Sequence, residues 1–388
     1  MSIERVNLLA TSNKKINGCI KVPGDKSISH RAIIISSIAQ GRTKINGYLD
    51  ATDVNATINA CRAIGAAIEE SKDTLIIDGN DLERHHGDAI DLNFGNSGTS
   101  MRLMMGILSA QKFSSVLIGD ESLNQRPMDR VSNPLLRMNA DIKTSDGKPP
   151  VYIDPVPSIK CIDHMVDIAS AQIKSSILLA GLYGENAFTI TTPQSRDHTE
   201  IMLSQFGCNI SIEPDSIKME PGKPISPEFI QIPGDISSAA FFIVGSIISK
   251  NSQIIIENVG LNPLRTGLIE ILRMMGANIH ITNIKTVNGE MVGNIHAESS
   301  SLNGIEIPKE LIASSIDELP LIVLAASQAN GKTAIRNAEE LRVKESDRIL
   351  SMIKMMDAFK IATDEFPDGM NVYGGSIKGA RVSSFGDH

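Results

Sequence analysis

The chain has 388 residues, of which 41% are hydrophobic and 21% are charged, and its formal net charge is −8 at pH 7. This length predicts two domains, each large enough to bury a core of its own. The acidic balance argues against nucleic acid or an anionic membrane as a partner, although it leaves room for a local basic pocket.

Along the chain, five very apolar stretches predict helices, and each one is opened by polar residues. They are residues 27–39, 97–110, 170–182, 237–249 and 315–329. Because they have almost no polar face, we expect these helices to be buried on all sides. Residues 21–25 (KVPGD) and 231–235 (QIPGD) lie just before two of them. This repeat indicates two related halves, with the chain crossing between them near Val22 and Ile236.

A second set of helices is amphipathic, and each of its members is followed by a short β-like run. These segments are residues 58–68, 135–142, 201–210, 268–279 and 349–361. The turn residues expected at the helix ends are Gly65, Asn139, Gly207, Gly276 and Asp357, at intervals of 68 to 81 residues. Gly and Asn suit the left-handed conformation that ends many helices. The pattern predicts an α/β fold built from repeated units of roughly 70 residues.

The repeat also predicts how the domains are composed. We expect residues 22–236 to form one domain of three units. Residues 1–21 plus 237–388 should form the second domain, with two units and the start of a third. Gly386, Asp387 and His388 have the sequence expected where a sixth unit opens, so we expect the C-terminal part of that unit to be absent.

Basic residues accumulate where the buried helices begin. A helix N-terminus carries free N–H groups and a partial positive charge, so several of them meeting in one cleft would bind anions. Residues 24–31 (GDKSISHR) place Lys26 and Arg31 around Ser27, at an expected helix start. Such cations oppose the helix dipole unless an anion binds there. Ordinary N-capping is the alternative for any single terminus, and a solvated basic turn is the alternative for this one.

Three further motifs follow in the first half. Residues 93–102 (NFGNSGTSMR) contain Gly95 and Gly98, which let the backbone approach a ligand closely. Arg126 precedes Pro127, which fixes the backbone, although an exposed surface arginine is the alternative. Residues 170–174 (SAQIK) open the third buried helix, and residues 195–199 (SRDHT) cap the helix that follows.

The second half contributes acids as well as bases. Residues 315–319 (SIDEL) open a buried helix with two acids, for which ordinary capping is the alternative. Residues 341–348 (LRVKESDR) place Lys344 and Arg348 four apart, on one face of an expected helix. An ion-paired surface helix is the alternative there.

Together these motifs resemble the 5-enolpyruvylshikimate-3-phosphate synthase family. GDKSISHR, NSGTSMR, QRPM, SAQIKSS, SSIDELP and LRVKESDR stand in the family's order between about Val22 and His388. The wording of SAQIKSS and EELRVKESDR is closest to the branch called class II. The resemblance implies a two-domain inside-out α/β barrel of the enolpyruvyl transferase type, with helix N-termini aimed at the cleft between domains.

The resemblance also implies an activity, with shikimate 3-phosphate and phosphoenolpyruvate as the small-molecule partners. The enolpyruvyl group of phosphoenolpyruvate would move to the 5-hydroxyl of shikimate 3-phosphate by addition and elimination, releasing phosphate. This step belongs to the shikimate pathway, which leads to chorismate and the aromatic amino acids, and the family is the target of glyphosate. The resemblance implies no cofactor and no metal, and we expect a monomer.

The resemblance assigns roles to individual residues by their place in the matching motifs. Implied ligands of shikimate 3-phosphate are Lys26, Ser27, Arg31, Ser170, Ala171, Gln172, Arg196, Asp317 and Lys344. Implied ligands of phosphoenolpyruvate are Lys26, Gly98, Arg126, Gln172 and Arg348. The implied catalytic residues are Asp317 as proton acceptor for the attacking hydroxyl, Glu345 as proton donor to the methylene carbon, and Lys26. The family's Asp-His-Arg motif is cut after His388, and a later lysine that binds phosphoenolpyruvate is also missing from the sequence.

The cysteines and the N-terminus suggest a compartment. Cys19, Cys61, Cys161 and Cys208 have no metal-ligand spacing and would make a sparse disulfide framework. The N-terminus lacks the apolar core of a signal peptide, and no apolar run reaches the ~18 residues of a membrane span. We therefore expect free thiols in a cytoplasmic protein.

Two other functions fit parts of the sequence. The enolpyruvyl transferase that acts on UDP-N-acetylglucosamine shares the fold, but it differs at the first motif and usually has a cysteine on the loop before its Arg-Pro pair. Residues 120–125 contain no cysteine. A non-catalytic relative that binds one substrate is the second alternative, and only the missing tail supports it.

Overall fold

The computed structural model describes residues 8–9, 15–79 and 89–387, so His388 of the expected sixth unit lies outside the described residues. The helices are α1 (Lys26–Ile38), α2 (Thr52–Ala63), α3 (Gly98–Leu108), α4 (Asp129–Arg137), α5 (Ala171–Gly181), α6 (His198–Gln205), α7 (Ile236–Ile248), α8 (Gly267–Met274), α9 (Lys309–Ser315), α10 (Leu319–Ala326) and α11 (Arg348–Ala358). Two 3₁₀ helices are η1 (Leu123–Gln125) and η2 (Glu339–Val343).

The strands are β1 (Asn17–Ile20), β2 (Gly41–Asn46), β3 (Ala67–Ser71), β4 (Thr74–Gly79), β5 (Ile90–Asn93), β6 (Ser115–Ile118), β7 (Asp141–Ser145), β8 (Lys148–Asp154), β9 (His164–Met165), β10 (Phe188–Thr191), β11 (Ile210–Glu213), β12 (Ser216–Met219), β13 (Phe229–Gln231), β14 (Gln253–Gly260), β15 (Asn278–Val287), β16 (Glu290–Glu298), β17 (Lys332–Ile335), β18 (Thr363–Phe366) and β19 (Gly369–Tyr373). Four of the described sheets repeat one plan, in which a parallel pair continues into an antiparallel hairpin. Their orders are β13-β2-β4-β3, β5-β6-β8-β7, β9-β10-β12-β11 and β1-β14-β16-β15. The fifth, β17-β19-β18, is antiparallel throughout.

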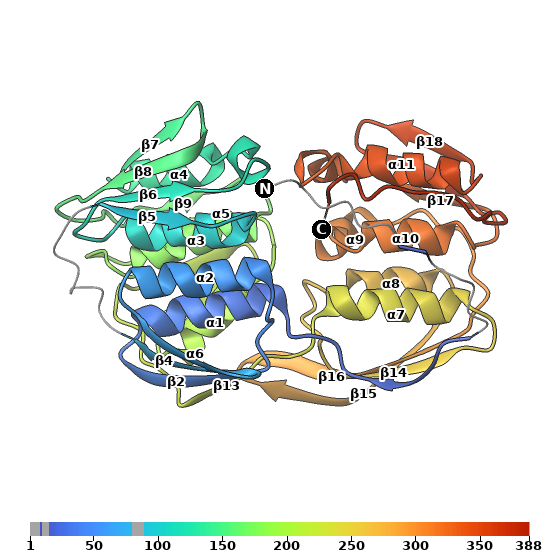
Figure 1. Cartoon of the computed structure of the whole chain (residues 1–388), viewed down its shortest axis with the longest axis horizontal. Coiled ribbons are helices and arrows are strands. Elements are labelled where there is room, and N and C mark those ends of the chain that lie inside the picture. The colour runs from blue at the N-terminus through green and yellow to red at the C-terminus, as the bar shows by residue number, and fades with distance from the viewer. Residues whose placement is uncertain (1–7, 10–14, 80–88, 388) are drawn as a thin grey trace.

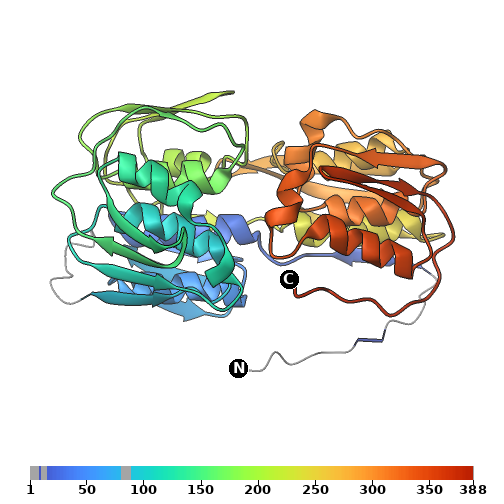
Figure 2. The ribbon, with the colours of Figure 1, turned by 90° about the horizontal axis from the view of Figure 1, so that it is seen from above.

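The helices lie inside and the sheets lie outside in both halves of the molecule (Figure 1). This is the inside-out α/β architecture expected from the sequence. Seen from above, the two halves stand side by side, and the last part of the chain runs back along the second half toward the first (Figure 2). The helix ends of one half face those of the other across the middle of the molecule.

The chain passes between the halves twice, at two segments that lie antiparallel to each other. The N–H of Asp25 donates to the carbonyl of Pro233, and the N–H of Asp235 donates to that of Pro23, both at 2.9 Å. One hydrophobic cluster runs from Ile28 to Ile232, and another starts at Ile236. We propose that these clusters are the cores of the two expected domains, residues 22–236 and residues 1–21 plus 237–388.

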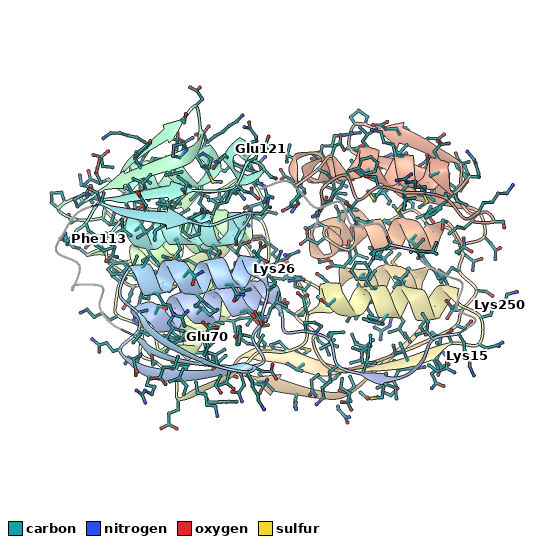
Figure 3. All side chains as sticks on the ribbon, viewed as in Figure 1. Lys15, Lys26, Glu70, Phe113, Glu121 and Lys250 are labelled. Atoms are coloured by element: carbon teal, nitrogen blue, oxygen red, sulfur yellow. The ribbon has the colours of Figure 1, made fainter. Side chains whose placement is uncertain are left out.

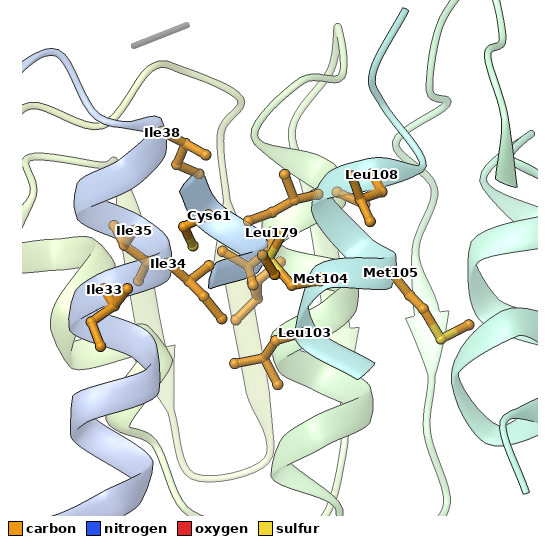
Figure 4. Packing of buried hydrophobic residues seen from close by; sticks show 14 of the residues in the cluster. Ile33, Ile34, Ile35, Ile38, Cys61, Leu103, Met104, Met105, Leu108 and Leu179 are labelled. Carbon is orange, nitrogen blue, oxygen red and sulfur yellow. The ribbon is translucent and has the colours of Figure 1, made fainter. Parts of the chain in front are cut away.

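The first buried helix agrees with its apolar sequence. Residues 32–35 of α1 are fully buried in succession, although consecutive residues point to different sides of a helix. Figure 4 shows Ile33, Ile34 and Ile35 of α1 packing in the same cluster as residues of α3 and α5. The expectation of complete burial is wrong for α7, where Phe241 is 66% exposed and Phe242 42%. Within the described residues, α7 packs against one helix, α10, and two strands, β14 and β16. Helix α1 instead packs against three other helices, α2, α3 and α6.

The amphipathic helices end in one shared hydrogen-bond pattern. At Gly65, Asn139, Gly207 and Gly276 the backbone is left-handed, as expected, and the N–H donates to the carbonyl three residues back. The expectation of Asp357 for the fifth unit is wrong. Helix α11 continues to Ala358, and Lys360 takes the left-handed position with a φ of 64°.

The fifth buried helix also differs from expectation. Ser315 ends α9, residues 316–318 form a turn, and α10 begins at Leu319. Pro320 lies in the first turn of α10, where its missing N–H costs no helical hydrogen bond. Asp317 therefore lies in a turn between two helices and not at a helix start.

Candidate active site

Three helix N-termini of the first half carry the residues of the first site motifs. Helix α1 begins at Lys26, one residue earlier than expected, because Asp25 caps it by accepting the N–H of Ile28 at 2.9 Å. Ser97 and Ser170 cap α3 and α5 in the same way. Figure 3 labels Lys26 at the end of α1 that faces the second half. Its Nζ lies 3.4 Å from Asp53 Oδ2.

Arg31 lies one turn further along α1 and is buried. Its guanidinium donates to Thr199 Oγ1 at 2.6 Å, to the Ser27 carbonyl at 3.0 Å and to Ser175 Oγ at 3.2 Å. These contacts hold it against α6, which begins two residues after Arg196. Burial is the main cause that lowers the pKa of Arg31 to about 10, so the group stays cationic at neutral pH.

The glycine-rich loop, η1 and α5 form the next part of the site. Arg102 donates to Gln172 Oε1 at 2.8 Å, and Gln172 Nε2 donates to Thr99 Oγ1 at 3.1 Å. Arg126, which follows η1, donates to Asn96 Oδ1 at 2.6 Å. A methyl group built on Gly98 would lie 3.1 Å from Arg126 Nη1, so the guanidinium packs directly against the glycine.

Asp317 lies among cations from both halves. Arg196 of the first half donates to its Oδ2. Arg348 Nη1 and Lys344 Nζ of the second half lie 3.3 Å and 3.6 Å from its Oδ1. Burial would raise the pKa of Asp317, but Arg196, Lys344 and Arg265 together hold it well below its usual range. Asp317 is therefore a carboxylate at neutral pH.

Glu345 is the second acid that meets cations from both halves. Arg126 Nη1 of the first half lies 3.1 Å from its Oε1, and Arg348 Nη2 lies 2.8 Å from its Oε2. Burial would raise the pKa of Glu345, but these two arginines lower it below the ordinary glutamate value. Arg348 also pairs with Asp387, with Nε 2.9 Å from Oδ2.

The motif that carries Lys344 and Arg348 is not one helix, so the expectation that both lie on one helical face is wrong. Residues 339–343 form η2, Lys344 is extended, and α11 begins at Arg348. Asp347 caps α11 by accepting the N–H of Leu350 at 3.0 Å, which sets the helix start. The alternative of an ion-paired surface helix therefore does not hold.

The structure thus brings many of the expected residues into two groups of contacts, which share Arg126. Gln172, Gly98 and Arg126 meet around Arg102, while Arg126, Glu345, Arg348, Asp317, Arg196 and Lys344 form one chain of ion pairs across the halves. Lys26, Ser27 and Arg31 lie together on α1, and Ser170 and Ala171 lie beside Gln172 at the start of α5. Sequence reasoning missed the role of Arg102, although this residue stands in the quoted glycine-rich motif.

Comparison with known proteins bears directly on this arrangement. The family model described as EPSP synthase (3-phosphoshikimate 1-carboxyvinyltransferase) matches residues 10–388. The chain belongs to the EPSP synthase family. This confirms the resemblance seen in the motifs and sets aside the UDP-N-acetylglucosamine enzymes as its family.

Individual relatives and structures support the same family. Proteins named 3-phosphoshikimate 1-carboxyvinyltransferase from Vesicomyosocius okutanii and from Legionella pneumophila strain Lens are each 46% identical, with 96% of this chain covering 86% and 87% of theirs. An EPSP synthase structure from Acinetobacter baumannii matches with a TM-score of 0.84 and 44% identity, over 94% of this chain and 83% of that one. The enolpyruvyl transferase NikO from Streptomyces tendae shares the fold, with a TM-score of 0.73 at 16% identity, over 93% and 83% of the two chains.

Two properties of this chain concern other partners. Within the described part of the chain, no helix is long and apolar enough to cross a membrane. The same residues contain no group of three or more His, Cys, Asp or Glu side chains that could hold a metal ion.

Proposed function

We propose that this chain transfers the enolpyruvyl group of phosphoenolpyruvate to the 5-hydroxyl of shikimate 3-phosphate and releases phosphate. The observation that carries the proposal is the chain of ion pairs across the halves. Arg126 and Arg196 of the first half and Lys344 and Arg348 of the second face three carboxylates, Asp317, Glu345 and Asp387. Such an excess of cations suits a pair of polyanionic substrates. Each charged hydrogen bond to them is worth about 1.5–3 kcal/mol.

We assign most contacts of shikimate 3-phosphate to the first half, while phosphoenolpyruvate bridges the two halves. We propose that Lys26, Ser27, Arg31, Ser170, Ala171, Gln172 and Arg196 hold shikimate 3-phosphate, with Asp317 and Lys344 reaching it from the second half. We propose that Lys26, Gly98, Arg126, Gln172 and Arg348 hold phosphoenolpyruvate. Both substrates then touch both halves, so their binding favours a closed cleft from which water is excluded.

The chemistry needs one base and one acid. Asp317 takes the proton of the 5-hydroxyl while the hydroxyl oxygen adds to C2 of phosphoenolpyruvate. Glu345 delivers a proton to C3. In the second step C3 loses a proton, the bond between C2 and the phosphate oxygen breaks, and phosphate leaves. A positioned acid and a positioned base each contribute about 10²–10⁴-fold to the rate. Lys26 provides a positive charge between the two anionic substrates.

The ionised state of Glu345 sets the order of events. Without substrate, Arg126 and Arg348 keep its pKa low, so it cannot donate a proton at neutral pH. Phosphoenolpyruvate competes for the same two arginines and adds negative charge beside Glu345. Both effects raise the pKa of Glu345, so binding of phosphoenolpyruvate itself favours the protonated form of Glu345 that can act as the acid.

The proposal is tested by measuring phosphate release with each substrate alone and with both together. Release that requires both substrates, with a product heavier than shikimate 3-phosphate by the enolpyruvyl group, supports the transfer. Binding of shikimate 3-phosphate without phosphate release would instead support the non-catalytic alternative.

Hydrogen exchange should reveal how the halves share the substrates. With shikimate 3-phosphate alone, we expect stronger protection in residues 24–31, 170–174 and 195–199 than in residues 315–319. Adding phosphoenolpyruvate should extend protection to residues 341–348. The hairpin of β15 and β16 serves as an internal control that stays unchanged. Protection by shikimate 3-phosphate mainly within residues 237–388 would contradict the division.

Gly98→Ala should separate glyphosate from phosphoenolpyruvate. The added methyl group would press on Arg126 Nη1 at 3.1 Å and Arg102 Nη1 at 3.3 Å, and glyphosate is the longer of the two ligands. We expect measurable inhibition of the parent chain by glyphosate. The substitution should raise the inhibition constant at least ~10-fold, about 1.4 kcal/mol, relative to the phosphoenolpyruvate KM.

A control distinguishes this effect from altered backbone geometry. Gly98 is the first residue of α3, whereas Gly95 has a φ of 54° and resists substitution by alanine. Gly95→Ala should therefore impair both ligands alike. An unchanged ratio of inhibition constant to KM in Gly98→Ala would rule out the steric explanation.

A further inference from the structure

A buried arginine joins three helix N-termini directly behind the proposed site. Arg265 lies in the connection between β14 and α8, and its side chain is 4% exposed. Around it lie the carboxylates of Asp25, Asp235 and Glu318, which are the N-cap residues of α1, α7 and α10. One of these helices belongs to the first half and two belong to the second.

The contacts of Arg265 reach all three acids at once. Nη1 lies 3.5 Å from Asp25 Oδ2, and Nη2 lies 3.5 Å from Asp235 Oδ1 and 3.8 Å from Glu318 Oε1. Nη2 also donates to Ser237 Oγ at 2.8 Å, and the Ser237 hydroxyl donates to Glu318. A single planar guanidinium therefore spans the meeting point of the two halves.

Each of these acids adjoins a residue of the proposed site. Asp25 precedes Lys26 and Ser27, and the N–H of Lys26 donates to Asp235 Oδ2 at 3.2 Å. Glu318 follows Asp317 in the turn before α10. The network thus connects the backbone that carries Lys26 in one half with the backbone that carries Asp317 in the other.

We propose that Arg265 is a positioning residue that fixes the separation between the start of α1 and the Asp317 turn. It touches neither substrate, and its role rests on the proposed function, in which Lys26 and Asp317 act on the same pair of substrates. A displacement of about 1 Å between reacting groups can cost ~10²-fold in rate. A rigid connection at this point therefore contributes to kcat more than to binding of shikimate 3-phosphate.

The identity of the residue follows from its geometry. A guanidinium presents five N–H donors in a plane and can face several carboxylates at once, whereas an ammonium is a compact point charge. Three buried carboxylates around one cation are stable only if that cation stays charged. Burial opposes its charge, but Asp25, Asp235 and Glu318 outweigh burial and raise the pKa of Arg265 above its ordinary value.

Arg265→Lys tests the proposal, because it keeps the positive charge and removes the planar guanidinium with its several N–H donors. We expect kcat to fall at least ~10-fold, while the dissociation constant of shikimate 3-phosphate, measured by calorimetry, stays within about threefold. Activity is expressed per folded site, counted from the calorimetric stoichiometry, so that a loss of folded protein does not count as a loss of kcat. A kcat within about twofold of the parent would overturn the proposal, since a residue that only neutralises buried charge is replaced well by lysine.

Two more variants complete the experiment. Arg273→Lys makes the same change on α8 at an exposed pair with Glu270, and it should alter neither quantity. If Arg265→Lys does not fold, Ser237→Ala removes the hydroxyl between Arg265 and Glu318 and leaves both charged side chains in place. It should lower kcat about threefold with unchanged binding of shikimate 3-phosphate, and an unchanged kcat would overturn the proposal. A parent chain that binds both substrates but forms no product would instead refute the proposed function.

Discussion

Asp317→Asn should lower kcat at least ~10²-fold while the dissociation constant of shikimate 3-phosphate stays within a few-fold. Asparagine keeps the shape of the side chain but cannot take up the proton of the attacking hydroxyl. Helix capping does not account for this acid, because Asp317 lies in a turn and its carboxylate contacts Arg196, Lys344 and Arg348. Steady-state rates and calorimetry on the same preparation measure the two quantities.

Asp347→Asn is the matched control for that substitution. Asp347 does cap a helix, accepting the N–H of Leu350 at 3.0 Å, and asparagine caps a helix about as well as aspartate. This variant should keep kcat within about threefold of the parent. Near-normal turnover in Asp317→Asn would remove Asp317 from the role of base.

Glu345→Gln should also lower kcat by ~10²-fold, without weakening the binding of phosphoenolpyruvate. Glutamine cannot deliver a proton to C3. It also removes the negative charge that competes for Arg126 and Arg348, at 3.1 Å and 2.8 Å, so the KM for phosphoenolpyruvate should stay the same or fall. In the parent chain, kcat should decline as rising pH deprotonates Glu345 in the complex, and the variant should lack this decline.

Glu340→Gln provides the comparison for Glu345. Glu340 pairs with Arg130 across the two halves at 3.0 Å, but both side chains are more than a third exposed, so the pair contributes little. Its kcat should remain within about threefold of the parent. If Glu345→Gln raised the KM for phosphoenolpyruvate without lowering kcat, Glu345 would be a ligand and not the acid.

Local sequence patterns predicted much of the fold. The left-handed turns at Gly65, Asn139, Gly207 and Gly276 could be predicted because glycine and asparagine favour that conformation. Lys360 could not, since lysine gives no such signal and Asp357 lies inside the helix. Likewise, the spacing of Lys344 and Arg348 fitted a helix until the cap at Asp347 placed the helix start between them.

Contacts between distant parts of the chain could not be predicted from the sequence. Arg196 and Asp317 are 121 residues apart, and Arg126 and Glu345 are 219 apart, so no periodicity relates them. The motifs indicated which side chains belong to a site, but not that the two acids neutralise arginines of the opposite half. Arg265 lies in none of the motifs, and only its burial among three carboxylates indicates a role for it.

The most direct test of the account uses phosphoenolpyruvate with oxygen-18 in the oxygen that bridges carbon and phosphorus. After reaction with shikimate 3-phosphate, mass spectrometry follows the label into the two products. Addition and elimination break the bond between C2 and this oxygen, so the account predicts that the label appears in inorganic phosphate and that the organic product is an unlabelled enolpyruvyl ether. Label retained in pyruvate or in the organic product, or the absence of any product from the two substrates, would contradict it.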